Sequence, residues 1–219
     1  MSAMTEVSSL TGRLLVATPA LADPNFDRAV VLLLDHDEEG SLGVVLNRPT
    51  PVDVGDILEG WGDLAVEPGV VFQGGPVSLD SALGVAVVPG GATGEAAPLG
   101  WRRVHGAIGL VDLEAPPELL ASALGSLRIF AGYAGWGPGQ LEDELVDGAW
   151  YVVESEPGDV SSPSPERLWR EVCAASAASW RWWRRTRTTL RSTDACELQY
   201  PWLYEHSRAR ARDWYGDPR

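Results

Sequence analysis

"RAVVLLLDHDEEGSLGVVLNRP", residues 28–49, is the stretch of sequence that decides the fold. Its first half is an almost unbroken run of β-branched residues and leucines, long enough only for a strand that is buried on both faces. The turn sequence EEGS follows, and LGVVLNRP then repeats the apolar pattern. The stretch therefore predicts a hairpin in the core of a sheet.

The rest of the chain mixes strands and helices. Alternating or continuous apolar runs predict strands, apolar spacings of three and four predict helices, and segments rich in glycine or proline predict the connections. The expected strands are residues 12–19, 69–77, 82–90, 127–136 and 149–155, the expected helices are residues 54–62, 116–125, 137–148 and 161–172, and a surface loop is expected at residues 90–100. Because strands and helices do not alternate regularly and no internal repeat is visible, the sequence favours the α+β class.

Charge is distributed unevenly along the chain. Residues 1–172 hold eight arginines against 26 aspartates and glutamates, whereas residues 173–219 hold nine arginines against five acidic residues. An acidic body repels phosphate, so we do not expect residues 1–172 to bind nucleic acid.

Composition also restricts the compartment and the cofactors. No apolar run approaches the roughly 20 residues that a membrane span needs, and the N-terminal residues lack the features of a secretory signal. We therefore expect a soluble cytoplasmic protein that does not associate with membranes. The two cysteines, Cys173 and Cys196, lie late in the chain, so the main body has neither a disulfide scaffold nor a zinc cluster. We expect no bound metal or cofactor.

Three blocks of sequence together resemble the YqgE/AlgH family in their order and spacing. They are GRLLVATPALADPNFDRAVVLLLDHDEEGSLGVVLNRP (residues 12–49), FQGGPVSLDSALGV (residues 72–85) and RIFAGYAGWGPGQLEDELVDGAWYVV (residues 128–153). The resemblance implies that residues 8–172 form a single α+β domain with a bent, barrel-like, mostly antiparallel sheet flanked by helices. It implies no established reaction, and no catalytic residue is carried over from it. The family's frequent label of transcriptional regulator has no recognised DNA-binding motif behind it in this sequence.

Residues 173–219 depart from this pattern. They include SWRWWRRTRTTLR, residues 179–191, with three tryptophans and five arginines in one short window. Permitted codons for this region, read one base earlier, give LRRQRGELALVATYPDDPSLN and then a stop, which would continue the last helix, add an apolar strand and end the chain at about residue 193. We therefore predict that this tail is a frameshift product or disordered. If it is real, arginines interleaved with aromatics suit non-specific nucleic-acid or acidic-surface binding.

The first candidate site is a polar set that borders the hairpin. Its members are Asn25, Arg28, His36, Asn47 and Arg48, and they could converge at one end of the hairpin. Either arginine could hold an anion through two hydrogen bonds, and the histidine could carry a proton near neutral pH. The alternative is that the asparagines tie turns to the backbone. No Ser, Cys or carboxylate partner for His36 is evident, so its catalytic signal is weak.

The second candidate is the pair Gly74 and Gly75, between Gln73 and Pro76. Two glycines after a strand could bring backbone N–H groups toward a ligand, although the rest of a phosphate-binding loop is missing. The alternative is a structural turn.

The third candidate is a glycine-rich bend with Tyr133, Trp136 and Gln140, where a strand meets the start of a helix. Free N–H groups there favour an anion, and the aromatic rings could line a pocket or a protein interface. The alternative is helix capping and core packing, because the acidic residues Glu142, Asp143 and Glu144 already complement the helix dipole.

These observations favour binding over catalysis. No nucleophile–base pair, phosphate loop or dinucleotide fingerprint is evident. The first hypothesis is a cytoplasmic interaction or regulatory module that acts through a protein partner without catalysis of its own. The second is a small-ligand receptor or an enzyme that uses the corner of His36 and Arg48, or the bend from Tyr133 to Gln140. The third is direct transcriptional regulation, as the family label suggests.

Overall fold

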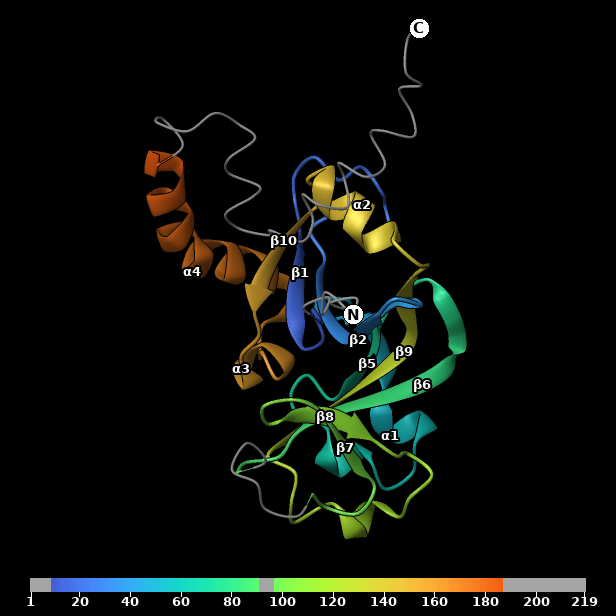
Figure 1. Ribbon diagram of the computed structural model, residues 1–219. Helices are drawn as coiled ribbons and strands as arrows, with labels where there is room; N and C mark the ends of the chain where they lie inside the picture. The colour runs from blue at the N-terminus through green and yellow to red at the C-terminus, as the bar shows by residue number, and fades with distance from the viewer. Residues whose placement is uncertain (1–8, 91–96, 187–219) are drawn as a thin grey trace, which may run out of the picture. The chain divides into compact units, whose positions relative to one another are not determined.

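The computed structural model describes residues 9–90 and 97–186 of the chain, with side chains described up to residue 175 (Figure 1). The strands are β1 (Arg13–Ala17), β2 (Val30–Asp37), β3 (Gly40–Val45), β4 (Pro49–Asp53), β5 (Val70–Gln73), β6 (Val77–Val87), β7 (Trp101–His105), β8 (Ile108–Val111), β9 (Ser126–Trp136) and β10 (Trp150–Glu154). The helices are α1 (Val54–Ile57), α2 (Gln140–Val146), α3 (Pro157–Val160) and α4 (Pro165–Thr186), with 3-10 turns η1 (Gly62–Leu64) and η2 (Pro117–Leu119). Contacts divide the chain into two units, and the fold that follows is that of residues 9–172.

The predicted hairpin is confirmed and lies inside a large sheet. In β2 and β3 the register pairs Val31 with Val45 and His36 with Ser41, with a bulge between Leu33 and Asp35. The strand order is β10-β1-β2-β3-β9-β6-β8-β7, and β5 joins β4 to β9. All pairs are antiparallel except β5 with β9.

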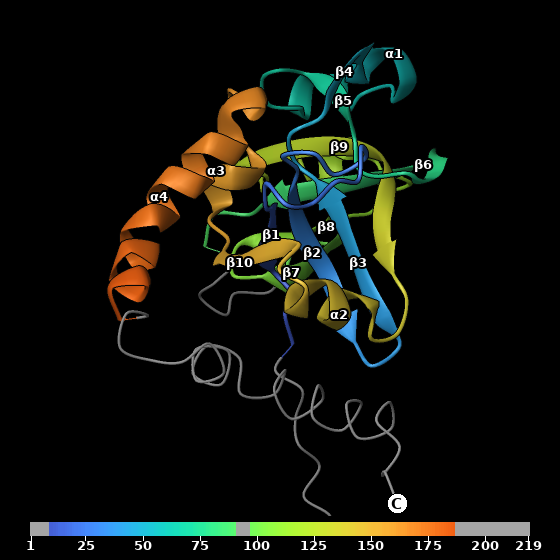
Figure 2. The same ribbon diagram turned by 90° about the horizontal axis from the view of Figure 1, so that it is seen from above.

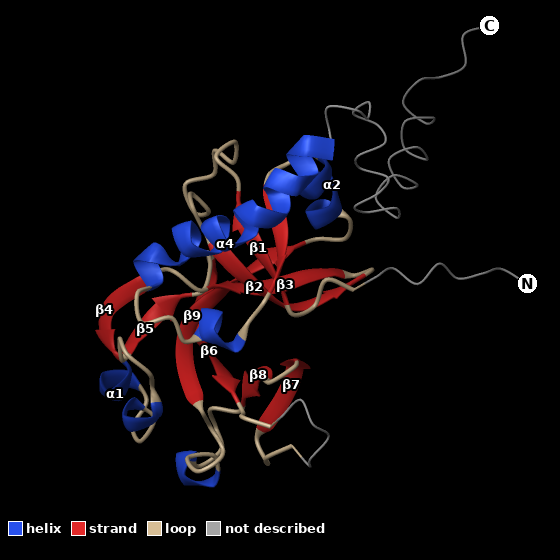
Figure 3. Cartoon of the chain, turned by 90° about the vertical axis from the view of Figure 1, so that its left-hand side faces the viewer, coloured by secondary structure: helices blue, strands red, loops and turns tan. Residues whose placement is uncertain are grey.

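The sheet curls into a half-barrel because β9 changes partners along one edge. Residues 41–43 of β3 pair with the end of β9, whereas β5 pairs with its middle at Phe130 and Ala131. Helix α2 contacts β3 and β10, and it crosses the ends of these strands in Figure 2. Figure 3 shows α1 and α2 outside the sheet and far from each other. The α+β class with a bent, mostly antiparallel sheet is confirmed.

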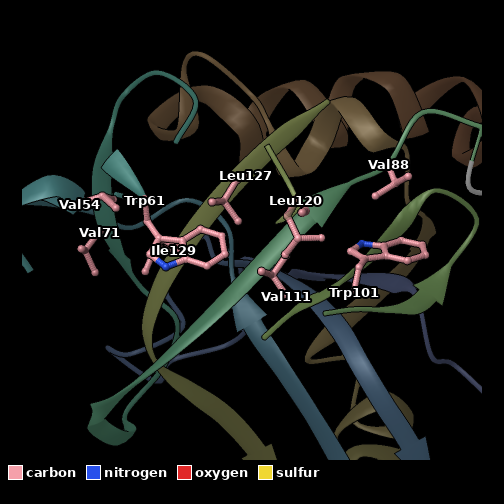
Figure 4. Close-up of a cluster of buried hydrophobic side chains, with 10 residues drawn as sticks. Val54, Trp61, Val71, Val88, Trp101, Val111, Leu120, Leu127 and Ile129 are labelled. Carbon is pink, nitrogen blue, oxygen red and sulfur yellow. The ribbon is translucent and has the colours of Figure 1, made fainter. Parts of the chain in front are cut away.

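One face of β6, β8 and β9 buries an apolar cluster (Figure 4). Its largest members are Trp61, Trp101, Leu120, Leu127 and Ile129, each no more than 5% exposed. Burying one such side chain is worth about 1.5–3 kcal/mol, so this cluster supplies much of the driving force that holds the loops around α1 and η2 against the sheet.

The opposite face of β9 buries a cation, Arg128. Its guanidinium lies 4.3 Å above the ring of Phe72 and donates hydrogen bonds to the carbonyl oxygens of Glu67 at 3.1 Å and Ser162 at 3.0 Å. Burial lowers the pKa of Arg128 to about 10. The residue therefore ties two connections, one before β5 and one between α3 and α4, to the middle of the sheet.

Several expected elements differ from the structure. The helix expected at residues 116–125 is only the 3-10 turn η2, because the N–H of Gly125 bonds to the carbonyl of Val87 and the chain turns directly into β9. The short strands β4, β7 and β8 were not predicted: prolines interrupt β4, charged residues interrupt β7, and β8 has only four residues. Helix α4 continues to Thr186, beyond the predicted boundary at residue 172. The remainder of the Arg/Trp-rich tail, and residues 91–96 of the expected loop, lie outside the described residues.

Candidate functional site

The hairpin separates the five residues of the first candidate between its two ends. His36 pairs with Ser41 beside the turn, at what we call the turn end. Asn47 and Arg48 follow β3 at the other end, which we call the cleft end. A strand rises about 3.3 Å per residue, so His36 lies about 20 Å from Val30 at the cleft end. The expectation that His36 and Arg48 share one corner is therefore wrong.

Asn47 holds the cleft end together. Its side chain is buried, accepts a hydrogen bond from the N–H of Val30 at 3.0 Å and donates one to the carbonyl of Arg28 at 2.9 Å. These two bonds fix the entry to β2, where Arg28 itself adopts a φ of 52° with its side chain exposed. For Asn47, the alternative of a turn tied to the backbone is confirmed.

A small cleft opens beside this end of the hairpin. It has a volume of about 110 Å³ and is lined by Pro24, Asn25, Val45, Arg48, Gln73, Gly75 and Pro76. The structure thus brings Asn25 and Arg48 of the first candidate together with Gly75 of the second. Gln73 and Pro76, which flank the glycine pair, also line this cleft. The lining contains one cation and no carboxylate, so its own charge is positive.

Arg48 is oriented by the backbone around it. Its guanidinium donates to the carbonyl oxygens of Asp27 and, at 3.4 Å, Asn47. An arginine has five N–H donors, so the two bonds leave three donors for another partner. Burial lowers the pKa of Arg48 below its usual value and the nearby Asp27 carboxylate opposes that shift. The side chain remains a cation in a fixed position, suited to a carboxylate or a phosphate.

The glycine pair serves close packing of two backbones. A Cβ on Gly74 would lie 2.2 Å from the carbonyl oxygen of Gly132, and a Cβ on Gly75 would lie 2.2 Å from the carbonyl carbon of Tyr133. Real Cβ atoms do not approach backbone so closely, so any larger residue would push β5 and β6 away from β9. Gly74 therefore has a packing role, and its N–H already donates to the carbonyl of Ala131, whereas Gly75 also forms part of the cleft wall.

The turn end encloses His36 between two partners. Nδ1 lies 2.8 Å from Oγ of Ser41, and Nε2 lies 3.7 Å from Oε1 of Glu142 in α2, while the histidine side chain is 0% exposed. The expectation that His36 lacks a Ser or carboxylate partner is therefore wrong. The sequence could not show the partners, because one comes from across the hairpin and the other from a helix much later in the chain.

The groups around the imidazole decide which of its two nitrogens carries the hydrogen and how readily the ring takes up a second proton. Glu142 faces Nε2, so the neutral tautomer with hydrogen on Nε2 is favoured, and the hydroxyl of Ser41 then donates to Nδ1. Burial lowers the pKa of His36, and the carboxylates of Glu142, Asp37 and Asp35 oppose that shift. Because the ring is fully buried, it works inside the fold, joining β2, β3 and α2.

The polar side chains of the glycine-rich bend also find hydrogen-bond partners inside the fold. Oε2 of Glu144 accepts hydrogen bonds from the indole N–H groups of Trp136 at 3.0 Å and Trp150 at 2.7 Å, and Oε1 accepts one from Gln140 at 2.9 Å. The two indoles and Phe26 pack ring against ring, with centroids 5.4–6.1 Å apart.

Two further residues of the bend, Gln140 and Tyr133, also lie against neighbours in the fold. Oε1 of Gln140 accepts from the N–H of Gly137 at 3.1 Å, and Tyr133 is half-buried opposite Val77 in β6. Capping and core packing, the alternative for this candidate, are confirmed for Trp136 and Gln140.

A second cleft lies at the edge formed by β7 and β8. Its volume is about 360 Å³, and its lining is Gly100, Trp101, Arg102, Leu110, Val111 and Asp112. It contains one cation and one carboxylate, so its lining carries no net charge. The cleft with Arg48 is therefore the better anion site of the two.

The described residues contain neither a metal-ligating cluster nor a membrane-spanning helix. Within them, no group of three or more His, Cys, Asp or Glu side chains is placed to hold a metal ion. None of the helices in this part of the chain is both long and apolar enough to cross a membrane.

The fold defines a class of protein, an α+β half-barrel with a curled, mostly antiparallel sheet, and one of its clefts is lined by a cation and no carboxylate. The model of the AlgH-like family, DUF179, matches residues 14–180, and the chain belongs to this family. It is 94% identical to a UPF0301 protein of Streptomyces avermitilis and 92% identical to one of Streptomyces coelicolor, in each case over 172 residues that make up 78% of this chain and 89% of the relative.

Solved structures agree with this assignment. The crystal structure of protein DIP2367 from Corynebacterium diphtheriae is 32% identical, with a TM-score of 0.70 over 75% of this chain and 86% of that one. The solution structure of the AlgH protein from Pseudomonas aeruginosa is 29% identical, with a TM-score of 0.58 over 80% of this chain and 92% of that one. The resemblance noted in the sequence is confirmed.

Proposed function

We propose that the protein acts by binding, as an interaction module without catalysis of its own, and that its site is the cleft with Arg48. The observation that carries this proposal is a guanidinium already oriented by two backbone carbonyls, with three N–H donors left over. Side-chain amides of Asn25 and Gln73 line the same cleft. A donor set fixed in advance loses little entropy when a ligand arrives, so it suits the binding of a small anionic group.

The other polar centres support binding rather than reaction. His36 and Glu144 already have partners inside the fold, whereas the Arg48 cleft is a concave site lined by a cation and by no carboxylate. The acidic body disfavours direct DNA binding, so a regulatory role would act through a protein partner. We place this activity in the cytoplasm, as the sequence predicts.

A thermal-shift titration of the full chain tests the proposal, with sodium acetate and sodium phosphate as probes at constant ionic strength. We expect at least one anion to raise Tm in a saturable way. The rise should be lost in Arg48→Ala and kept in Arg170→Ala, which removes an exposed arginine from α4. A rise of the same size in Arg48→Ala would contradict the proposal.

A further inference from the structure

We infer that the group held in the Arg48 cleft is the C-terminal carboxylate of a peptide chain. This inference rests on the proposed function, since it uses the same cleft and names its ligand. It is carried by the combination of one oriented cation with two exposed side-chain amides, Asn25 and Gln73, that line the same cleft.

The charge around the cleft selects an anion with a single negative charge. The Asp27 carboxylate is close enough to Arg48 to influence its pKa, and Oδ1 of Asp23 lies 2.8 Å from the backbone nitrogen of Asn25. Both acids repel a second negative charge on a ligand. A carboxylate carries one charge, whereas a phosphate group at neutral pH carries more than one. The cleft therefore fits a carboxylate better than a phosphate.

The side-chain amides of Asn25 and Gln73 favour a ligand that has a peptide unit next to its carboxylate. Each side-chain amide offers both N–H donors and a carbonyl acceptor. An isolated carboxylate uses only donors, so the amide oxygens of Asn25 and Gln73 would gain nothing from it. A peptide end presents an N–H donor and a C=O acceptor directly before its carboxylate, and it satisfies both kinds of group.

The volume and the apolar lining of the cleft also fit the C-terminal end of a peptide. A volume of about 110 Å³ admits a terminal carboxylate with the peptide unit before it, and it does not admit a folded element. Pro24, Val45 and Pro76 provide apolar walls for the terminal residue. Capture of a chain end is also consistent with an interaction module that recognises another protein.

The test is an NMR titration of the ¹⁵N-labelled full chain with four probes at one pH and one ionic strength: N-acetylglycylglycine, its C-terminal amide, sodium acetate and sodium phosphate. We expect N-acetylglycylglycine to shift the backbone amides of Gln73 and Gly75 in a saturable way and to bind about tenfold more tightly than acetate. The C-terminal amide should not saturate. Gln73→Ala should reduce the peptide's affinity to that of acetate, Arg48→Gln should abolish binding of both, and Arg170→Ala should change neither.

The possible failures separate the two proposals. Equal affinity for acetate and N-acetylglycylglycine, or tighter binding of phosphate, would overturn the peptide inference and leave the anion-binding function standing. Saturation by the C-terminal amide would also overturn the peptide inference. If no probe binds, or if binding survives Arg48→Gln unchanged, both proposals are overturned.

Discussion

The two ends of the β2–β3 hairpin place polar side chains in opposite environments. At the turn end, His36 is 0% exposed and lies between Ser41 and Glu142. At the cleft end, Arg48 is half-buried, bonded only to backbone carbonyls through part of its donor set, and open to the cleft. The hairpin is the same; the difference lies in what covers each end.

A polar residue at an end of the hairpin has a structural role where another element packs over it, and it can bind a ligand where none does. Helix α2 lies across the turn end and supplies two carboxylates: Glu144 accepts hydrogen bonds from the indoles of Trp136 and Trp150, and Glu142 lies 3.7 Å from Nε2 of His36. At the cleft end, the lining residues come from strand ends and loops, and neither a helix nor a carboxylate is among them. The cleft therefore stays open where the turn end is closed.

The largest effect should come from opening the turn end with Glu144→Ala. This change leaves two buried indole N–H groups, those of Trp136 and Trp150, without an acceptor, and each such loss costs about 1–3 kcal/mol. We expect the free energy of unfolding to fall by about 3 kcal/mol in urea denaturation followed by circular dichroism. Glu144→Gln should lose less because one oxygen remains. Glu118→Ala, at an exposed position, is the control, and an equal loss there would remove the special role of Glu144.

Asn47→Ala should give the next largest effect, at the cleft end. It removes the acceptor of the Val30 N–H and the donor to the Arg28 carbonyl, so we expect a loss of about 2 kcal/mol. Denaturation at neutral pH measures it. Asn25→Ala changes an exposed asparagine on the same side of the hairpin and should cost less than about 0.5 kcal/mol. Similar values for the two variants would mean that Asn47 does not hold this end together.

The buried imidazole should make the turn end sensitive to acid. Because burial lowers the pKa of His36, the unfolded chain binds its proton at a higher pH than the folded chain does. Stability is then fully present above about pH 6.5 and decreases as the pH falls toward the folded pKa, by up to about 1.4 kcal/mol per pH unit.

Denaturation midpoints between pH 7.5 and pH 5 measure this dependence. His36→Leu removes the titrating group and should flatten that part of the profile, whereas His105→Gln, at an exposed position, should leave it unchanged. An unchanged slope in His36→Leu would assign the acid sensitivity to other groups.

Local patterns in the sequence were enough for the hairpin, the α+β class and the tying role of Asn47. The contacts between distant segments were not accessible in the same way. Gln73 reaches the cleft because glycines let β5 approach β9, and Glu142 reaches His36 because α2 folds back over the hairpin. Both depend on the curl of the sheet, which no local spacing encodes. The error of placing His36 beside Arg48 came from reading neighbours in sequence as neighbours in space.

Residues 173–219 give a separate prediction, which stays untested because most of them lie outside the described residues. We propose that they result from a frameshift. In support, the matched 172 residues make up 89% of the two Streptomyces relatives but only 78% of this chain, so this chain has the longer unmatched part. The intact mass of the protein from its native source tests this: a mass well below 23.5 kDa is expected, and a mass matching all 219 residues would overturn the proposal.

The smallest effect on stability should come from Arg48→Ala, and this is what separates the two ends most sharply. Arg48 is half-buried and its bonds to carbonyls can be replaced by water, so we expect the free energy of unfolding to change by less than about 1 kcal/mol. Anion binding should nevertheless be lost. Arg48→Lys keeps the charge but not the planar fork of donors, so it should retain weakened binding. A destabilisation as large as that of Glu144→Ala would instead make Arg48 a structural residue, and the cleft end would then be no more available than the turn end.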